Sequence, residues 1–252
     1  LIYGANRTYG KLGWGMVFAQ NPDYINVPDP SDGSLDFGAA DSFTVSTWAY
    51  AESDFTAVDY ILDKRGSCYE EGYMIQIDND GINRLRFAIE DTSGNTPTIR
   101  TASNVLNPGQ WNYVVGVRDV ESDQLLVYTN GVFRTSITDT TTATLDTTAP
   151  LTIGMGGCQG GTERFNGSID EVKIWNRALS ADEIANAYSR DIGIGNITTQ
   201  NPLSVAVNVS SDADNDDALF TAIDWWKDNT LNATTGKPDD SGVVLFLPFD
   251  GS

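Results

Sequence analysis

The sequence contains no histidine and only two cysteines among its 252 residues. Histidine is the side chain that most often acts as a general base near neutral pH and binds transition metals. Its absence excludes catalytic devices of the Ser-His-Asp or Cys-His kind. No apolar run reaches the length of a membrane-spanning helix, so no membrane span is predicted. No signal peptide is recognisable either, so residue 1 is expected to be a processed terminus or the start of a piece of a longer protein.

Positive charge is also scarce. Fifteen Lys and Arg residues face 35 Asp and Glu residues, which gives a formal net charge of −20. A field of this sign repels nucleic acid and acidic membrane surfaces, so neither is expected as a partner. The excess of carboxylates suits either solubility or the binding of hard cations through oxygen ligands.

The cysteines, Cys68 and Cys158, are even in number, which fits one disulfide bond in an exported protein. Two buried free thiols are the alternative. Five Asn-x-Ser/Thr sequons, the acceptor pattern for N-glycosylation, add support for a glycoprotein located outside the cell or at its surface. The sequons begin at Asn6, Asn166, Asn196, Asn208 and Asn232.

Alternation of apolar and polar residues with a period of two runs through most of the chain and predicts β-strands. Asn130-Gly131 between two such runs is typical of a type I′ hairpin turn, because both residues tolerate positive φ. Asp80-Gly81 indicates a second tight turn. Strands are expected at 15–18, 24–27, 43–50, 60–64, 73–78, 85–90, 98–102, 111–118, 125–129, 132–137, 151–154 and 168–175.

One helix is predicted after these strands. Ser180 and Glu183 form a capping box, in which each side chain accepts a hydrogen bond from the other residue's backbone N–H. Ile184, Ala187 and Tyr188 then give an apolar stripe at helical spacing. The spacing predicts a helix from residue 181 to about 189.

The last sixty residues divide into two parts. Residues 196–242 contain two strand-like runs, 203–209 and 219–226, and are too few for a complete sandwich, so a small β linker domain is expected. Residues 243–249 are continuously apolar, which is typical of a buried strand. The predicted division is therefore 1–195, 196–242 and 243–252.

The stretch of residues 165–184 contains Ile-Asp-Glu-Val followed by the predicted helix. It resembles the closing signature of laminin-G-like, concanavalin A-like jelly rolls. Residues 11–28 and 43–50, and 111–119 together with 127–131, are similar to other parts of that pattern, so the resemblance covers about residues 1–190. It implies an all-β, two-sheet antiparallel jelly-roll sandwich with one short C-terminal helix. The family's Phe-Asp-Gly stands here as Phe18-Ala19-Gln20, so any role of that aspartate does not carry over.

In the family, a strand ending in Pro-Phe-Asp comes first, whereas here it lies at the C-terminus, at residues 245–251. The sequence is then cut from a tandem array, donates this strand to a neighbouring subunit, or folds it back as a circular permutation. An apolar strand left in water would aggregate, so it must be buried in a sheet. We predict that residues 243–249 pair beside residues 168–175 of an adjacent jelly-roll bead, which would build a head-to-tail filament.

The resemblance also implies a structural Ca²⁺. Related jelly rolls commonly hold this ion between an aspartate on the last strand and groups at the end of the first strand. Carboxylate and carbonyl oxygens are the ligands that Ca²⁺ prefers. The matching residues are Asp170, Asp250 and the carbonyl of Gly251, with Asp23 as a weaker third candidate.

A second, weaker Ca²⁺ candidate is the alternation of Asp212, Asp214 and Asp216. An EF-hand loop has Gly at its sixth position and Glu at its twelfth, and both are missing here. A solvated acidic turn is the alternative.

Catalysis is not expected. Some concanavalin-like glycosidases carry Glu-x-Asp-x-x-Glu on one strand, with two carboxylates on one face, and this sequence has no such strand. Asp170 and Glu171 are neighbours, which places them on opposite faces of a regular strand.

Sugar binding is the other possibility that the aromatic residues raise, because their faces offer stacking platforms. Most of the tryptophans match core positions of the family, and two that are adjacent in a strand must face opposite ways. The six are Trp14, Trp48, Trp111, Trp175, Trp225 and Trp226.

The sequence therefore predicts an extracellular structural or adhesive protein, a bead in a fibre or surface layer that partners copies of itself. The alternative is a Ca²⁺-dependent carbohydrate-binding module of a larger secreted protein, with glycans as partners.

Overall fold

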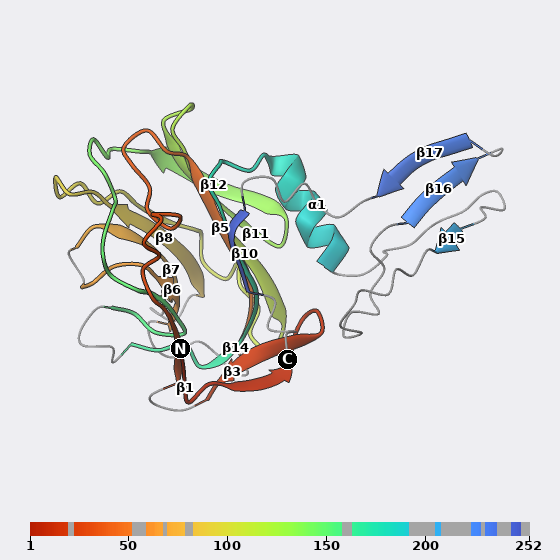
Figure 1. The fold of residues 1–252 in the computed structure, drawn as a ribbon, viewed down its shortest axis with the longest axis horizontal. Helices are drawn as coiled ribbons and strands as arrows, with labels where there is room; N and C mark the ends of the chain where they lie inside the picture. The colour runs from red at the N-terminus through yellow and green to blue at the C-terminus, as the bar shows by residue number, and fades with distance from the viewer. Residues whose placement is uncertain are drawn as a thin grey trace.

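Within the described residues, the computed structural model contains a two-sheet β-sandwich with one helix (Figure 1). Strand pairing is antiparallel throughout, and the two inner faces enclose an apolar core. This confirms the all-β jelly-roll architecture and the single short helix. The structure describes residues 1–19, 23–51, 59–67, 70–78, 83–157 and 163–191, with the strands at 205–207, 223–227, 230–235 and 243–247.

Sheet A contains seven strands. In spatial order they are β1 (Ile2–Tyr3), β4 (Tyr24–Val27), β13 (Leu151–Ile153), β6 (Asp59–Asp63), β7 (Gly72–Asp78), β8 (Arg84–Glu90) and β9 (Thr98–Arg100).

Sheet B contains eight strands, of which seven form one path. These are β12 (Val132–Thr138), β11 (Gln124–Thr129), β10 (Trp111–Asp119), β5 (Phe43–Tyr50), β14 (Gly167–Trp175), β3 (Trp14–Phe18) and β2 (Asn6–Tyr9). The eighth, β18 (Val243–Leu247), pairs with β14.

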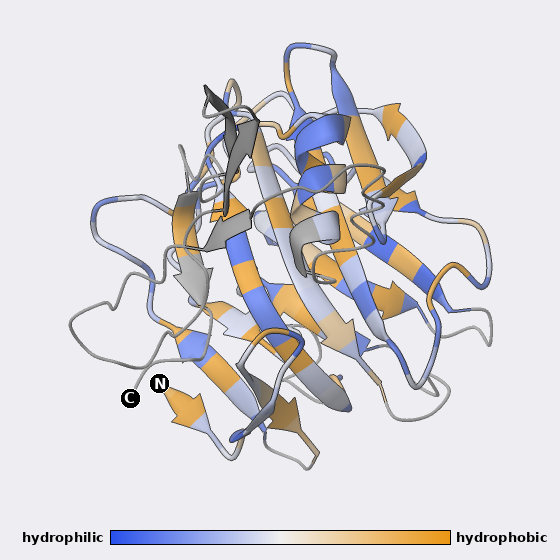
Figure 2. Cartoon of the chain, turned by 90° about the vertical axis from the view of Figure 1, so that its right-hand side faces the viewer, coloured by the Kyte–Doolittle hydropathy of each residue, from blue (hydrophilic) through white to orange (hydrophobic). Residues whose placement is uncertain are grey.

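Alternation along the strands sorts side chains between the core and the outer face of sheet B. Phe43 and Val45 of β5 lie fully buried between the sheets. Trp48 of the same strand instead packs under the helix α1 (Ala181–Asp191), where it stacks on Tyr188 with the ring centroids 5.6 Å apart. Figure 2 looks onto this helix-covered face and shows the alternation along its strands.

The predicted local signals are confirmed where the structure describes them. The backbone N–H of Ser180 donates to Glu183 Oε2 at 2.8 Å, and that of Glu183 donates to Ser180 Oγ at 3.3 Å, as a capping box requires. Asn130 and Gly131 have φ values of 52° and 73° and join β11 to β12. The Asp80-Gly81 turn lies outside the described residues.

A buried lysine ties the long loop after β4 to the loop after β12. The ammonium of Lys64 donates to Asp29 Oδ1 at 2.8 Å and to the carbonyl oxygens of Thr147 and Ala149 at 2.9 and 2.8 Å. Asp36 Oδ1 lies 3.3 Å away. Buried charge is tolerated only when it is paired and hydrogen-bonded in this way, so Lys64 fixes both loops.

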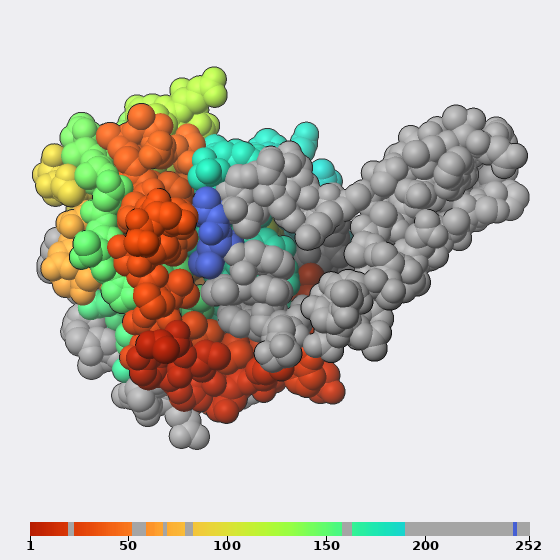
Figure 3. All heavy atoms as spheres, viewed as in Figure 1, coloured from red at the N-terminus to blue at the C-terminus, as the bar shows by residue number. Residues whose placement is uncertain are grey.

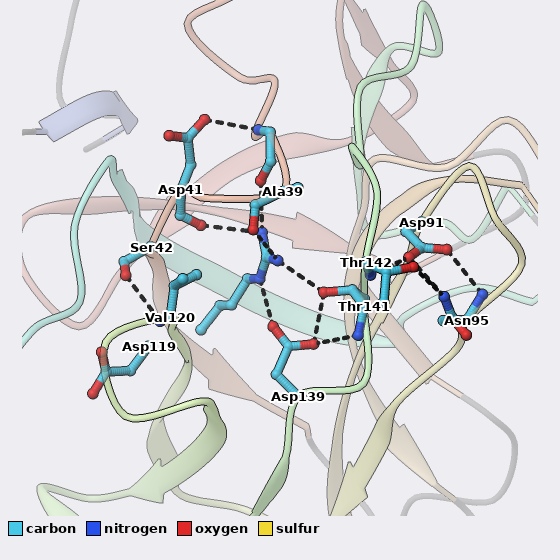
Figure 4. A network of polar contacts seen from close by, with 12 residues as sticks. Ala39, Asp41, Ser42, Asp91, Asn95, Asp119, Val120, Asp139, Thr141 and Thr142 are labelled. Atoms are coloured by element: carbon cyan, nitrogen blue, oxygen red, sulfur yellow. Dashed lines mark hydrogen bonds and ion pairs between the residues drawn. The ribbon is translucent and has the colours of Figure 1, made fainter.

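A buried arginine joins the same two loops at a second point (Figure 4). Arg118 lies on β10 and is 1% exposed, and its Nε donates to Asp139 Oδ2 at 2.7 Å. Its other donors reach the carbonyl oxygens of Gly38, Ala39 and Asp41 and the hydroxyl of Thr141.

Asp91 anchors the loop after β12 to the β8–β9 turn (Figure 4). Its carboxylate accepts hydrogen bonds from Nδ2 of Asn95 and from the backbone N–H groups of Asn95, Thr142 and Ala143. Burial favours the neutral acid, but these hydrogen bonds outweigh it and lower the pKa of Asp91 to about 2.

The C-terminal apolar strand lies in the sheet of its own chain. Along one edge of β14, β3 pairs with Gly167 through Ile169, and β18 pairs with Val172 through Trp175. Two short strands therefore fill one edge, end to end, and Figure 3 shows the described part of β18 (blue) at the surface.

The apolar C-terminal strand was predicted to lie beside the same residues of an adjacent bead. In the structure it is instead the chain's own β14 that receives it, with Val244 and Leu245 packed against the core. Roughly 50 residues separate α1 from β18, which at about 3.3 Å per residue is ample to bring the strand back. Of the three arrangements considered, the folded-back one is the arrangement seen.

A β-bulge interrupts β14 at Asp170. Ile169 and Val172 both belong to the core between the sheets, although they are three residues apart. A regular strand would not place them on one face, and the extra residue of a bulge accounts for it. Glu171 has φ 52°, a left-handed conformation that is rare for a side chain other than Gly, Asn or Asp. The regular alternation expected of Asp170 and Glu171 is therefore wrong.

A separate three-stranded sheet follows the helix in the sequence. It consists of β15 (Val205–Val207), β16 (Ile223–Lys227) and β17 (Thr230–Thr235). The first two overlap the predicted strands, and the third falls within a polar stretch that gave no strand signal. The β2 hairpin strand was not predicted either.

Candidate functional site

An open pocket of about 450 Å³ lies on the outer face of sheet A. The inward residues of β4 and β13 belong to the core, so the residues that alternate with them, such as Asn26 and Thr152, point into the pocket. Its volume is within the usual range of small-molecule sites. The described residues that line it are Tyr3, Tyr24, Asn26, Arg65, Gly66, Pro150, Thr152, Met155, Gly156, Gly157 and Arg164.

Two tyrosines form an aromatic pair in the pocket lining. Tyr3 on β1 and Tyr24 on β4 are direct cross-strand partners. Their rings stack with centroids 4.5 Å apart and an interplanar angle of 10°. Tyr3 is 39% exposed, although large aromatic side chains are usually buried. The pair offers an apolar, flat surface beside hydrogen-bonding groups.

Two arginines line the same pocket, and they differ in the partners that hold them. Arg65 is held by Asp63, whose carboxylate accepts from Nε at 2.9 Å and from Nη2 at 3.1 Å. Arg164 places its guanidinium carbon 5.8 Å from the centroid of the Tyr24 ring, which is cation–π distance. Its Nη1 donates to the sulfur of Met155 at 3.2 Å, and its Nε is buried without a hydrogen-bond partner in the part of the chain that the structure describes.

Asp63 organises the floor of the pocket. Besides holding Arg65, it accepts a hydrogen bond from the backbone N–H of Gly157 at 3.0 Å. Burial raises the pKa of Asp63, and the opposing charge of Arg65 counters that rise. The loop backbone at Gly157 lies so close that an added Cβ would come 2.3 Å from the carbonyl oxygen of Arg65. Glycine is therefore required for the loop to lie flat against the sheet.

The predicted metal ligand Asp170 is buried below the β2–β3 turn. Its Oδ2 accepts from the backbone N–H of Leu12 at 2.9 Å, and its Oδ1 accepts from that of Glu171 at 2.8 Å. Burial is the main cause that raises the pKa of Asp170 to about 7, and these hydrogen bonds oppose it. A Cβ on Gly10 would lie 2.3 Å from Oδ2, which explains the Gly-Lys-Leu-Gly segment: it wraps the Asp170 carboxylate closely.

The other predicted metal ligands do not join Asp170 in the described part of the chain. Asp23 is buried, and its Oδ2 accepts from the backbone N–H of Ala19 at 2.9 Å. Within the described ranges, no three acidic, cysteine or histidine side chains group closely enough to hold a metal ion. The remaining candidates lie outside those ranges: Asp250, Gly251, Asp212, Asp214 and Asp216.

The predicted cysteines and two of the five sequon asparagines also lie outside the described residues. This holds for Cys68, Cys158, Asn196 and Asn208, and for Asn232 only its backbone, in β17, is described. Asn6 on β2 and Asn166 before β14 are both exposed, so both are accessible for modification.

The tryptophans divide between the core and the surface. Trp48 and Trp175 are buried under α1, and Trp111 packs against the same cluster. Trp14 is 40% exposed and stacks on Tyr9 of the β2–β3 hairpin, with centroids 5.0 Å apart. The side chains of Trp225 and Trp226 are not described.

The aromatic pair and both arginines of the pocket were not predicted from the sequence. The strand predicted at 24–27 already implied that Tyr24 and Asn26 share one face, whereas the pairing of β13 that adds Thr152 to that face was not predicted. No sequence signal indicated that β1 would pair with β4, or that Arg164 would reach this face from a distant loop.

Comparison with known proteins agrees with the sandwich. The profile of the concanavalin A-like lectin/glucanases superfamily matches residues 20–185. A comparison with curated protein sequences gives no match. The described part of the chain contains no helix long and apolar enough to cross a membrane.

Several solved binding domains share the fold. The receptor-binding domain of botulinum neurotoxin D aligns with a TM-score of 0.61 and 16% identity, over 77% of this chain and 48% of that domain. The chain thus spans about half the length of the toxin binding domains it resembles. The module CBM40 of the Ruminococcus gnavus IT-sialidase, bound to α2,3-sialyllactose, aligns at 0.55 and 17%, over 69% of this chain and 96% of that module.

Domain 4 of AbnA, an extracellular arabinanase from Geobacillus stearothermophilus, was solved with arabinotriose. It aligns with a TM-score of 0.53 and 22% identity, over 73% of this chain and 81% of that domain. At these identities the likeness is one of fold, and it agrees with the strand order and the sequence profile. The chain belongs to the concanavalin A-like lectin/glucanase superfamily.

Proposed function

We propose that the chain is an extracellular carbohydrate-binding module, and that it takes its sugar in the pocket on the outer face of sheet A. The observation that carries this proposal is the stacked pair of Tyr3 and Tyr24 at an open pocket of about 450 Å³. The C–H face of a sugar ring is apolar and packs on an aromatic face. Its hydroxyl groups need hydrogen-bonding partners, and Asn26 and Arg164 are placed to supply them.

The fold neighbours support the same class of function. The CBM40 module and domain 4 of AbnA were both solved with oligosaccharides, and both are parts of larger proteins. By analogy, this chain is proposed to recognise glycans as one module of a larger secreted protein. The head-to-tail filament loses its main support, because the strand that was to link the beads pairs with β14 of its own chain.

The module is proposed to bind its sugar without cleaving it. Glycoside hydrolysis commonly needs two carboxyl groups on either side of the scissile bond. None of the described residues that line the pocket is an aspartate or a glutamate. The absence of histidine from the sequence removes the common alternative base.

A structural Ca²⁺ at Asp170 remains part of the proposal. Asp170 is buried and lies two residues from Val172, the partner of Leu247 in β18, and Asp250 and Gly251 follow Leu247 in the sequence. Ca²⁺ at 100 times its dissociation constant would add about 2.7 kcal/mol to the free energy of unfolding. EDTA should then lower the melting temperature of the wild type, and should leave that of Asp170→Ala unchanged. A wild type that is insensitive to EDTA after verified metal removal contradicts this.

A printed glycan array tests the sugar-binding proposal. The wild type should bind at least one class of glycan, and Tyr3→Ala and Tyr24→Ala should each weaken that binding at least about tenfold, as expected when one stacking surface is removed. Phe133→Ala is the matched control, because Phe133 is 49% exposed on β12 of the other sheet. No binding to any glycan, or equal loss in the control, argues against the proposal.

A further inference from the structure

We propose that the sugar bound in this pocket is acidic and that Arg164 receives its carboxylate. This inference rests on the proposed function and specifies the ligand of the same pocket. The juxtaposition that carries it is an arginine that has no ion-pair partner among the described residues and lies beside the aromatic platform of Tyr24.

The charge of the pocket is opposite to that of the chain. The whole sequence has 35 acidic and 15 basic residues, yet the described lining of the pocket contains two arginines and no carboxylate. A strongly acidic protein repels an anionic ligand at long range. Screening limits that repulsion to about 10 Å at 0.1 M salt, so the charges within the pocket decide the binding.

The two arginines of the pocket have different roles. Arg65 is 6% exposed, and its positive charge is balanced by the bidentate ion pair with Asp63. Among the described residues Arg164 has no ion-pair partner, and the one hydrogen bond that its side chain makes to them goes to the weak acceptor Sδ of Met155. Of the two arginines in the described lining, Arg164 is therefore the one whose charge no ion pair within the described residues balances.

The unused donors of Arg164 select a planar anion. Arg164 is half-buried, and because its Nε is shielded from solvent, a ligand in the pocket would contact its terminal Nη1 and Nη2 groups. A carboxylate matches the guanidinium fork with two parallel hydrogen bonds, which a single hydroxyl does not. The stack of Tyr3 on Tyr24 lies beside Arg164, so one ligand can place its ring on the aromatic surface and its carboxylate on the guanidinium.

The experiment compares sugars that differ only in their charged group. An array carries uronate- and sialate-bearing glycans, each beside its carboxyl-reduced form and beside a sulfated neutral glycan of the same backbone. The wild type should bind an acidic member at least about tenfold more tightly than its reduced form, in line with the strength of hydrogen bonds to charged groups. Raising the salt concentration should narrow that ratio.

Variants of Arg164 separate the carboxylate contact from the rest of the site. Arg164→Gln should bind the acidic and reduced forms equally and weakly, and Arg164→Lys should recover part of the preference through its charge alone. Arg134→Gln, on β12 of the other sheet, makes the same change of charge and should keep the wild-type preference.

The outcomes distinguish this inference from the proposed function. Equal binding of acidic and carboxyl-reduced glycans would contradict the recognition of a carboxylate by Arg164, while the proposal of sugar binding would stand. Tighter binding of the sulfated glycans than of the carboxylated ones would also contradict it and would identify sulfate as the recognised group. Binding of no glycan at all defeats the proposed function, and this inference falls with it.

Discussion

The guanidinium Nε of Arg118 lies 2.7 Å from Oδ2 of Asp139, and the two side chains are 1% and 5% exposed. Arg118→Met would leave Asp139 as a buried, unpaired carboxylate and would free the loop carbonyls that Arg118 holds. Breaking a buried pair from one side commonly costs about 3–5 kcal/mol of the free energy of unfolding. Urea unfolding followed by tryptophan fluorescence measures this cost.

The control for this prediction is Arg134→Met. Arg134 lies at a more exposed position on β12, where it donates to Thr129. A change at such a position should cost less than about 1 kcal/mol. Equal costs at residues 118 and 134 would mean that the buried network of Figure 4 does not hold the loops.

Asp59 on β6 gives a dependence of stability on pH. The side chain is 6% exposed, and burial raises the pKa of Asp59 to about 7, opposed by a hydrogen bond from the backbone N–H of Asn166. Between pH 4 and pH 7 the folded state therefore holds a proton that the unfolded state has lost. The free energy of unfolding falls as pH rises through this window, by at most about 4 kcal/mol for this group.

Asp59→Asn should remove the contribution of this group to the decrease in the free energy of unfolding with rising pH. Chemical unfolding at pH 5 and pH 8 measures that decrease. Asp170, whose pKa is also raised to about 7, leaves a residual slope in the variant. Asp146→Asn, at an exposed position, is the control and should keep the wild-type slope. A wild type that is equally stable at both pH values would show that Asp59 is not buried as described.

The disulfide between Cys68 and Cys158 remains a prediction, and their described neighbours support it. Gly66 and Gly157, two residues and one residue before the cysteines, lie together: a Cβ on Gly157 would be 3.5 Å from the carbonyl carbon of Gly66. Closing a loop of about ninety residues should stabilise the fold by roughly 4–5 kcal/mol in the chain-entropy estimate. Mass spectrometry after alkylation without reductant should find neither thiol modified, and two alkylated thiols would refute the bond.

The position of β18 predicts a monomer. Because this strand completes the edge of β14 within its own chain, no edge is left for a second chain to fill at this point. Analytical ultracentrifugation should give a single species of one chain at micromolar concentration. Hydrogen exchange should find the amides of residues 243–247 protected in that species. Oligomers that grow with protein concentration would contradict this prediction and would support the head-to-tail assembly.

The fold was predictable from the sequence because its signals are local or carried by a family pattern. Strand alternation, the Asn130-Gly131 turn and the Ser180 capping box each depend on residues close together in the chain. The bulge at Asp170 was not predictable, since it appears only where β14 meets two different partner strands along one edge.

The pocket was not predictable for the same reason. Tyr3, Tyr24 and Arg164 come from a terminal strand, an early strand and a late loop, and only the order β1-β4-β13 of sheet A brings them together. The tryptophans were instead considered as stacking platforms, and most of those that the structure describes are packed beneath α1.

The central claim is that this pocket, and not the other exposed aromatic pair, binds sugar. Isothermal titration with the best glycan from the array tests it by comparing Tyr24→Ala with Trp14→Ala, which truncates the stacked pair on the β2–β3 hairpin. The pocket assignment predicts at least about tenfold weaker binding for Tyr24→Ala, as expected when a stacking face is lost, and wild-type affinity for Trp14→Ala. Loss of binding in Trp14→Ala with wild-type affinity in Tyr24→Ala would contradict it.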